Sequence, residues 1–211
     1  MPGAGPGNSV ESCESVANVS FAPLPVTAAW QHHQVRSGFE VVYFEPTAGG
    51  YHVQGATVAI EDGTSWVVNY EIDLDASWHT RGAHISGRST AGPRRMLLEA
   101  DGMGSWRING KPAPHLGGCL DVDLESSAMT NTLPVHRIDL DVGEKAAAPA
   151  AYVRAVGLAV ERLEQTYERI ADDAGRQRYG YAAPLFEFTC RLVYDHTGLV
   201  FDYPGIAVRA G

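Results

Sequence analysis

The feature that most constrains this chain is a sustained alternation of apolar and polar side chains over residues 64–75. The apolar members of the run are Trp66, Val68, Tyr70, Ile72 and Leu74. Most of the residues between them are polar. Because successive side chains of a β-strand point to opposite faces of a sheet, this period of two predicts a strand with one buried face and one face in water.

The same alternation returns along most of the chain, in residues 39–45, 51–60, 78–86, 95–100, 105–108, 118–124, 135–142, 151–158 and 186–194. Turn signals separate these runs. The clearest is Asn109-Gly110, since both residues tolerate the positive φ angles that a two-residue hairpin requires. Strands at this spacing, without long helices between them, predict a mainly β protein whose antiparallel sheet curls or closes.

One segment fits this scheme poorly. In residues 158–171, the apolar side chains Val160, Leu163, Tyr167 and Ile170 recur at helical spacing. Gly175 then stands where such a helix would end. Taken alone, this local pattern favours a helix.

The net charge of the chain argues against some classes of binding partner. The 211 residues include 16 Lys and Arg against 25 Asp and Glu, which gives a net charge of −9. Nucleic acids and anionic membranes reward clustered basic residues, so we expect neither as a partner. No stretch reaches the ~18 apolar residues that a membrane-spanning helix needs, and we therefore expect a cytoplasmic protein.

Residues 1–25 are rich in Gly, Pro, Ser and Asn and show neither an apolar period nor a signal-peptide pattern. We expect them to form a flexible N-terminal tail, followed by a single domain over residues 26–211. Cys13, Cys119 and Cys190 match neither a disulfide framework nor a metal clip. Free thiols suit the cytoplasm, and the last two cysteines lie in alternating runs that predict buried, unreactive side chains.

A series of short motifs follows in order along the chain. It consists of Trp30 with Glu40, Trp78-His79-Thr80-Arg81, residues 101–106 (DGMGSW) with Asn109-Gly110, residues 119–124 (CLDVDL), residues 130–134 (TNTLP) with Arg137, Gln165-Thr166-Tyr167, and residues 198–204 (GLVFDYP). The ordered set resembles the bacterial family described as putative glycolipid-binding, formerly a domain of unknown function. The match covers roughly residues 28–209.

The resemblance implies a spiral β-roll, in which a large, mostly antiparallel sheet wraps around one short helix. It also implies a homodimer and, by analogy with carrier folds that hold acyl chains, an amphipathic, glycolipid-like ligand. The family places Gln165 and Tyr167 in a strand, and we follow it there against the helical spacing. Where the family tends to carry two arginines, this chain has His136-Arg137, so no paired-arginine site is carried over.

Within this fold, the central helix is expected to run from Leu124 to Leu133. Pro134 would end it, because a residue that precedes proline avoids helical geometry. A helix of this length depends on contacts with its surroundings rather than on intrinsic propensity.

Two Asp-x-Asp pairs lie on the flanking runs, Asp121 with Asp123 and Asp139 with Asp141. Period two places each pair on one strand face, and the simplest interpretation is a solvated outer face. A functional interpretation makes the carboxylates ligands for a metal or acceptors for sugar hydroxyls. If their face looks inward they need partners, since unpaired buried charge is costly, and Arg137 is a candidate.

The candidate ligand-binding residues are Trp78, Arg81, Trp106, Asp121, Asp123, Asn131, Arg137 and Tyr167. Aromatic rings can stack on a sugar or line an acyl channel, although at alternate strand positions they more often fill a core. Arg81 orients a head group or is simply exposed, and Asn131 either tethers the central helix or contacts the ligand. We expect no metal and no other cofactor, because the eight histidines show no ligand spacing.

Three functions stay open from the sequence. The first is a binding or carrier protein that holds an amphipathic molecule inside the curled sheet. The second is a cofactor-independent cyclase or isomerase for a hydrophobic intermediate, with Asp121, Asp123, Arg137 and Tyr181 as candidate acids and bases. The third is a structural dimeric module without a ligand.

Overall fold

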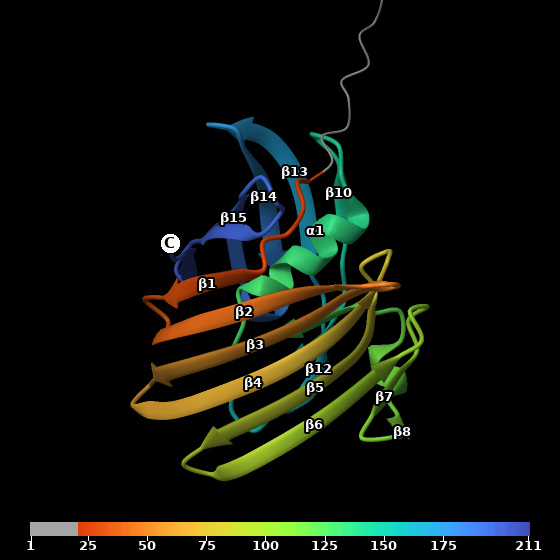
Figure 1. Ribbon diagram of the computed structural model, residues 1–211, viewed down its shortest axis with the longest axis vertical. Coiled ribbons are helices and arrows are strands. Elements are labelled where there is room, and N and C mark those ends of the chain that lie inside the picture. The colour runs from red at the N-terminus through yellow and green to blue at the C-terminus, as the bar shows by residue number, and fades with distance from the viewer. Residues whose placement is uncertain (1–20) are drawn as a thin grey trace, which may run out of the picture.

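The computed structural model of the protein describes residues 21–211. The predicted tail therefore falls largely outside the described residues, and so does Cys13. The described chain is mainly β, with one large curled sheet and a short helix crossing its interior (Figure 1). This confirms the predicted fold class.

The first half of the large sheet is a meander of mostly long strands. They are β1 (Thr27–His32), β2 (Ser37–Thr47), β3 (Gly50–Glu61), β4 (Thr64–Asp75), β5 (Thr80–Ser89), β6 (Gly92–Ala100), β7 (Trp106–Ile108) and β8 (Lys111–Pro112). Each pairs antiparallel with the next. The alternation predicted for β4 is observed, since its five apolar members are all buried. Asn109 and Gly110, at φ 49° and 76°, form the predicted hairpin turn between β7 and β8.

The second half comes mainly from the C-terminal third of the chain. Its strands are β10 (Lys145–Ala147), β13 (Thr166–Asp173), β14 (Arg176–Ala183), β15 (Phe188–Tyr194), β16 (Val200–Tyr203) and β17 (Ala207–Arg209). β17 pairs with β1, which joins the two halves into one antiparallel sheet of 14 strands within residues 21–211. β1 and β17, from opposite ends of the domain, thus join the two halves, while β10 and β8 are the first and last strands of the sheet.

The helical spacing in residues 158–171 misleads. Val160 and Leu163 lie in β12 (Val160–Leu163), whereas Tyr167 and Ile170 lie in β13, which pairs with β10 and β14. Leu163 and Tyr167 are four residues apart because the link between β12 and β13 lies between them. The family expectation is confirmed for Tyr167, while Gln165 lies one residue before β13, and Gly175 belongs to the β13–β14 turn.

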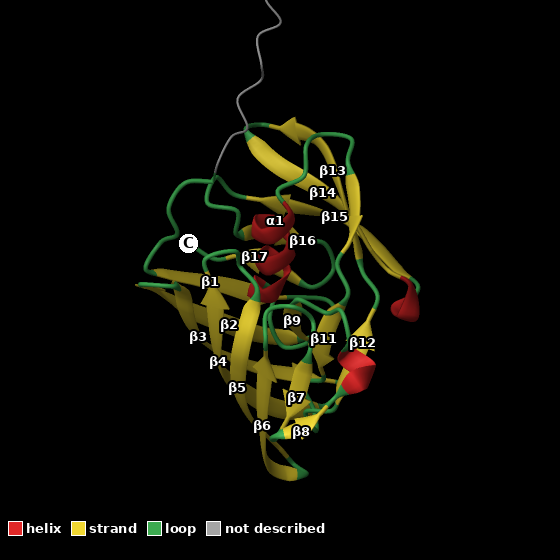
Figure 2. Ribbon diagram, turned by 90° about the vertical axis from the view of Figure 1, so that its right-hand side faces the viewer, coloured by secondary structure: helices red, strands yellow, loops and turns green. Residues whose placement is uncertain are grey.

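A smaller sheet lies between the two halves of the large one (Figure 2). It contains β9 (Asp121–Leu124), β11 (Ala150–Val153) and β12, with β9 and β11 parallel. Every residue of β9 and β11 is buried. A strand that is covered on both faces has no solvent-exposed side. Alternation in its sequence therefore does not indicate which side chains face the solvent.

The helix lies later than predicted. Residues up to Leu124 belong to β9, and the 3₁₀ turn η2 (Met129–Asn131) leads into α1 (Thr132–Ile138). Pro134 lies in the first turn of α1, where a backbone N–H has no intrahelical partner to lose. The predicted strand over residues 135–142 is also wrong, because α1 continues to Ile138 and Asp139 ends it at φ 48°. Asp139 and Asp141 therefore do not share a strand face.

Two further 3₁₀ turns complete the described elements. η1 (Pro114–Leu116) follows β8, and η3 (Pro184–Phe186) joins β14 to β15. η3 forms the tip of a hairpin that projects from the body on the right of Figure 2. Leu185 and Phe186 at this tip are exposed.

One glycine decides how the interior of the long-stranded half is packed. Gly55 of β3 lies directly opposite Tyr70 of β4. A Cβ atom at position 55 would lie 2.1 Å from Cζ of the Tyr70 ring, which rests on the bare backbone there. The hydroxyl of Tyr70 then reaches Glu40 of β2 at 2.6 Å.

We expect Gly55→Ala to displace Tyr70 and break this hydrogen bond. The loss should be about 2–4 kcal/mol in the free energy of unfolding, measured by urea denaturation, because a clash and the loss of a buried hydrogen bond to a carboxyl group combine. Gly49→Ala is the matched control, since nothing lies within 4 Å of its Cβ position. Equal stability of the two variants would contradict this account.

Candidate functional site

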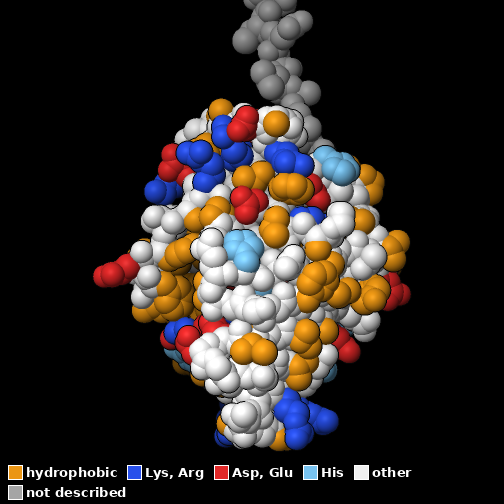
Figure 3. Space-filling view, turned by 90° about the vertical axis from the view of Figure 1, so that its left-hand side faces the viewer, with side chains coloured by type: hydrophobic (Ala, Val, Ile, Leu, Met, Phe, Trp, Pro, Cys, Tyr) orange, Lys and Arg blue, Asp and Glu red, His pale blue; other side chains and the backbone are white. Residues whose placement is uncertain are grey.

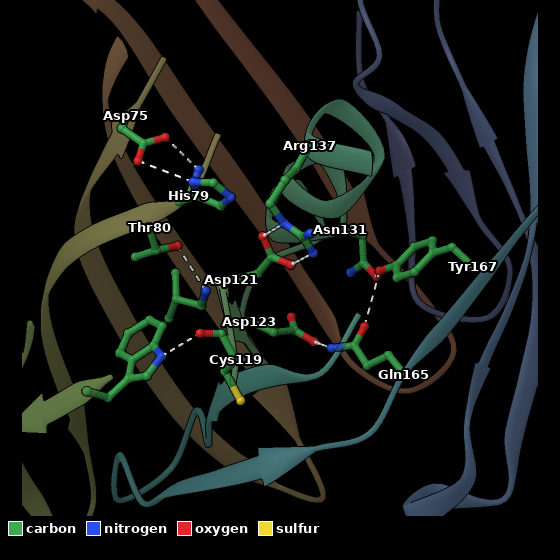
Figure 4. Close-up of polar contacts among 12 residues, drawn as sticks. Asp75, His79, Thr80, Cys119, Asp121, Asp123, Asn131, Arg137, Gln165 and Tyr167 are labelled. Carbon is green, nitrogen blue, oxygen red and sulfur yellow. Dashed lines mark hydrogen bonds and ion pairs between the residues drawn. The ribbon is translucent and has the colours of Figure 1, made fainter. Parts of the chain in front are cut away.

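β9 carries two carboxyl side chains into the interior. Asp121 and Asp123 are 2% and 7% exposed. The simplest interpretation, a solvated outer face, is therefore wrong for this pair. Because β9 belongs to the inner sheet, the face that holds the two aspartates looks toward α1 and the β13 side of the roll (Figure 4).

Asp121 forms a two-point ion pair with Arg137. Arg137, in the last turn of α1, donates from Nε to Oδ1 at 3.0 Å and from Nη2 to Oδ2 at 2.6 Å. Burial raises the pKa of Asp121, and the guanidinium opposes that rise. The expectation that Arg137 supplies the partner of an inward-facing carboxylate is confirmed, and the pair attaches α1 to β9.

Asp123 is buried without such an ion pair among the described residues. Its Oδ1 accepts a hydrogen bond from the Thr130 hydroxyl at 2.9 Å, and its Oδ2 accepts one from Nε2 of Gln165 at 2.7 Å. Two neutral donors do not offset the loss of water, so burial raises the pKa of Asp123 to about 6. A carboxyl group that titrates near neutrality is a marker of functional sites.

Asn131 tethers the start of α1, as one of the two sequence interpretations predicted. The Tyr167 hydroxyl donates to Oδ1 of Asn131 at 2.9 Å and also lies 3.1 Å from Oε1 of Gln165. The Tyr194 hydroxyl donates to the backbone carbonyl of Asn131 at 3.0 Å. These contacts use the Asn131 oxygens, and its Nδ2 donates no hydrogen bond to a described residue.

Glu40 is a buried polar residue that the sequence analysis did not select as a site residue. It is 0% exposed and accepts hydrogen bonds from Tyr70 Oη at 2.6 Å, Ser127 Oγ at 2.5 Å and the Ala128 N–H at 2.8 Å. Burial raises its pKa. The available signal was its inward position in an alternating run beside Val42 and Phe44.

A pocket of about 250 Å³ opens beside these groups. Asp123, Ser127 and Asn131 supply its buried polar lining. Glu40 and Thr57 hold the loop before η2 in place, since Thr57 Oγ1 donates to the Ser126 carbonyl at 2.8 Å. The polar end of the pocket is therefore fixed by both the large and the small sheet.

Aromatic rings form one wall of the pocket. Tyr181 and Tyr203 meet edge to face with centroids 6.0 Å apart, and Phe188 lies 6.2 Å from the first ring and 6.1 Å from the second. Leu163 and Ile206 extend this apolar lining. A small apolar cavity with a few convergent polar groups is the common form of a small-molecule site.

Ion pairs surround the pocket mouth. Arg154 contacts Glu161 at 2.7 Å and Glu125 at 3.3 Å, and its guanidinium lies 5.1 Å from the centroids of Tyr152 and Phe186. On the opposite side, Arg36 donates to the Glu125 carbonyl at 2.6 Å and lies 3.4 Å from Glu61. Phe186 of η3 and Val35 and Arg36 of the β1–β2 turn also line the pocket.

The structure brings only some of the predicted residues to this pocket. Asp123, Asn131 and the acid–base candidate Tyr181 line it. Asp121, Arg137 and Tyr167 lie behind it, in the network that positions α1. The other candidate residues, Trp78, Arg81 and Trp106, are not part of its lining.

These three residues have structural surroundings. Trp106 is buried and donates from Nε1 to the Cys119 carbonyl at 2.8 Å. Trp78 stacks on His136 of α1 with centroids 3.8 Å apart. Arg81 is half-exposed and lies 3.6 Å from Asp75.

Within residues 21–211, no cluster of three or more His, Cys, Asp or Glu side chains has the arrangement of a metal site. Cys119 is buried as predicted, whereas Cys190 is only partly buried. Desolvation raises the thiol pKa of Cys119 to about 11 and that of Cys190 to about 12, which disfavours the reactive thiolate. Over the same residues, we find no helix with the length and apolar character needed to cross a bilayer.

The architecture defines a class of protein, in which one large antiparallel sheet curls around a short helix and leaves a small lined pocket beside it. A family model matches residues 27–209, and this chain belongs to the family described as "Putative glycolipid-binding". Among curated proteins, none matches it.

Two solved structures are similar. A DUF1089 family protein from Pseudomonas aeruginosa has 32% identity and a TM-score of 0.69, over 81% of this chain and 92% of that one. A β-barrel-like protein of the domain of unknown function DUF1849 from Brucella abortus has 11% identity and a TM-score of 0.49, over 87% and 92% of the two chains.

We expect Asp123→Asn to change how stability depends on pH. The pKa of Asp123 is about 6 in the folded protein, against an ordinary value of 3.8 for an aspartate in water. Between these values the folded state holds a proton that the unfolded state has released, so this group lowers stability as the pH rises. Above pH 6 the variant should be the more stable protein by up to about 3 kcal/mol, at 1.36 kcal/mol per pKa unit.

Chemical denaturation from pH 4 to pH 8 measures this difference. In the variant, Gln165 can turn its amide by half a rotation and keep the hydrogen bond. Asp62→Asn, at an exposed turn position, is the control for the substitution itself and should change stability little. A pH-independent difference for Asp123→Asn would refute the assigned titration.

Proposed function

We propose that this protein binds an amphipathic small molecule with an uncharged, hydroxyl-bearing head in the pocket beside Asp123. The observation that carries the proposal is the juxtaposition of a polar end, made by Asp123, Ser127 and Asn131, with the aromatic wall of Tyr181, Phe188 and Tyr203. The family description supports a binding role.

The chemistry of the polar end favours a neutral head over an anion. The Asp123 carboxylate accepts hydrogen bonds and repels negative charge, while Nδ2 of Asn131 is a donor. A hydroxyl group both donates and accepts, so it can satisfy both side chains at once. The alkyl part of the ligand then replaces water against the aromatic wall, where each buried methylene group contributes about 0.8 kcal/mol.

Octyl β-glucoside below its micelle concentration is a suitable probe, because it joins one hexose to a short chain. We expect saturable binding by isothermal titration calorimetry and much weaker binding of octyl sulfate. Ile206→Trp should fill the pocket and weaken glucoside binding at least about tenfold, which corresponds to ~1.4 kcal/mol.

Met103→Trp also introduces a tryptophan, in a loop where Met103 is 83% exposed and outside the pocket lining, and should leave binding unchanged. Equal binding of the glucoside and the sulfate would reject the recognition of a neutral head. Undiminished binding by Ile206→Trp would place the ligand elsewhere.

The proposal extends to a homodimer through the outer face of β2 and β3. Phe39 and Val58 are cross-strand neighbours there, and Tyr43 and Ile60 extend the patch, with exposures from 40% to 56%. Exposed apolar patches on a sheet face are typical of association surfaces. The free thiols of Cys119 and Cys190 support a cytoplasmic location, where thiols stay reduced.

We expect Phe39→Lys/Val58→Lys to produce a monomer in light scattering coupled to size-exclusion chromatography, because like charges would oppose each other across the interface. Met103→Lys is the control, since Met103 is 83% exposed but lies in a loop away from this face. A wild-type protein that is already monomeric at high concentration would remove the dimer from the proposal.

A further inference from the structure

Two arginines at one end of the roll lack the carboxylate partners that this acidic chain offers elsewhere. Arg137, Arg154 and Arg178 all form ion pairs. Arg176 and Arg209 form none with a described residue. Figure 3 shows basic side chains gathered toward the upper end of one face, although the whole chain carries a net charge of −9.

Both arginines line the same hollow of about 540 Å³, here called the arginine hollow. Its other walls are the turn at Ala174-Gly175 between β13 and β14, the turn over residues 195–197 between β15 and β16, and the chain at Pro23 and Pro25. The hollow shares no lining residue with the pocket beside Asp123.

Each guanidinium is held against an aromatic ring. Arg176 lies 3.5 Å from the centroid of Phe201, and Arg209 lies 4.8 Å from that of Trp30. Stacking uses the flat face of a guanidinium and leaves its N–H edge available. Because the rings restrict both side chains before any ligand arrives, less conformational entropy is lost on binding.

The charge of Arg209 is poorly compensated. Its Nη1 is buried without a hydrogen-bond partner, and burial lowers its pKa despite the opposing field of Asp195. Oδ1 of Asp195 is already engaged, since it accepts hydrogen bonds from the N–H and hydroxyl of Thr197 and from the Leu199 N–H at 2.8, 2.6 and 3.1 Å. Asp195 lines the hollow and compensates the charge of Arg209 only in part, so an anion there would add negative charge beside the guanidinium.

We propose that the arginine hollow binds the oxyanion group of a small molecule, either a carboxylate or a phosphate. The planar fork of a guanidinium matches two oxygens of either group. This site is independent of the proposed function, because the pocket beside Asp123 has the opposite charge preference and lies between other elements.

Inorganic phosphate and succinate, titrated separately at low ionic strength, test the site. We expect saturable heat in calorimetry and a saturable change in tryptophan fluorescence, because Arg209 lies over Trp30. The anion that binds more tightly identifies the class of ligand. Arg176→Gln and Arg209→Gln should each weaken binding about tenfold or more, and octyl β-glucoside binding should stay unchanged.

Arg191→Gln is the matched control, since Arg191 is an exposed arginine of β15 outside the hollow. It should leave anion affinity within about twofold of the wild type. Should Arg209→Gln fold poorly, Arg176→Gln decides alone, because Arg176 is exposed. No saturable binding of either anion, or equal weakening by Arg191→Gln, would overturn the proposal.

Discussion

The interior of this roll depends on carboxyl groups that face inward and must find partners there. Glu40 on β2, with Asp121 and Asp123 on β9, lies where water cannot reach freely. The three carboxyl groups have different partners. Glu40 accepts hydrogen bonds from several neutral donors. Asp121 forms a two-point ion pair with an arginine, and Asp123 accepts hydrogen bonds from two neutral side chains. Since a buried polar group without partners is costly, these requirements fix which loops and strands can lie beside them.

The short helix illustrates the consequence. α1 has seven residues, too few to be stable alone, and apolar packing by itself would let it slide or rotate. Arg137 fixes its last turn to β9, while Tyr167 and Tyr194 fix its start through Asn131. Polar contacts with defined geometry thus select one position for an element that propensity barely supports. The pocket follows from that choice, because the same loop and helix start present Ser127 and Asn131 to it.

The sequence predicts strands with one solvent-exposed face better than strands that are covered on both faces. Alternation predicted β4 correctly because one of its faces is wet and the other dry, so the sequence records the difference. It also predicted a strand at β9, but it assigned Asp121 to a solvated face, because both faces of β9 are covered and the partner of Asp121 lies 16 positions away. In residues 158–171, apolar side chains of two strands fall at helical intervals, so the local pattern alone predicted a helix. The family resemblance corrected this for Tyr167, and the pairing of β12 with β11 and of β13 with β10 and β14 explains why both segments are strands. Glu40 was detectable in principle, as a lone acid on the inward side of a strand, but its partners at 70, 127 and 128 are set by tertiary structure.

The two cavities differ in the kind of charge that the fold leaves uncompensated. Near β9, the uncompensated group is the Asp123 carboxyl, which accepts hydrogen bonds from only two neutral donors. A ligand that donates hydrogen bonds would therefore stabilise it. In the arginine hollow, the uncompensated groups are the guanidinium ions of Arg176 and Arg209, which stack on aromatic rings. A ligand that accepts hydrogen bonds would compensate them. The pocket beside Asp123 therefore disfavours the anion that suits the arginine hollow, because moving a like charge into a partly desolvated site costs far more than a surface contact returns. A curled sheet whose two halves come from opposite ends of the domain makes this separation possible, since the two cavities have no lining residue in common.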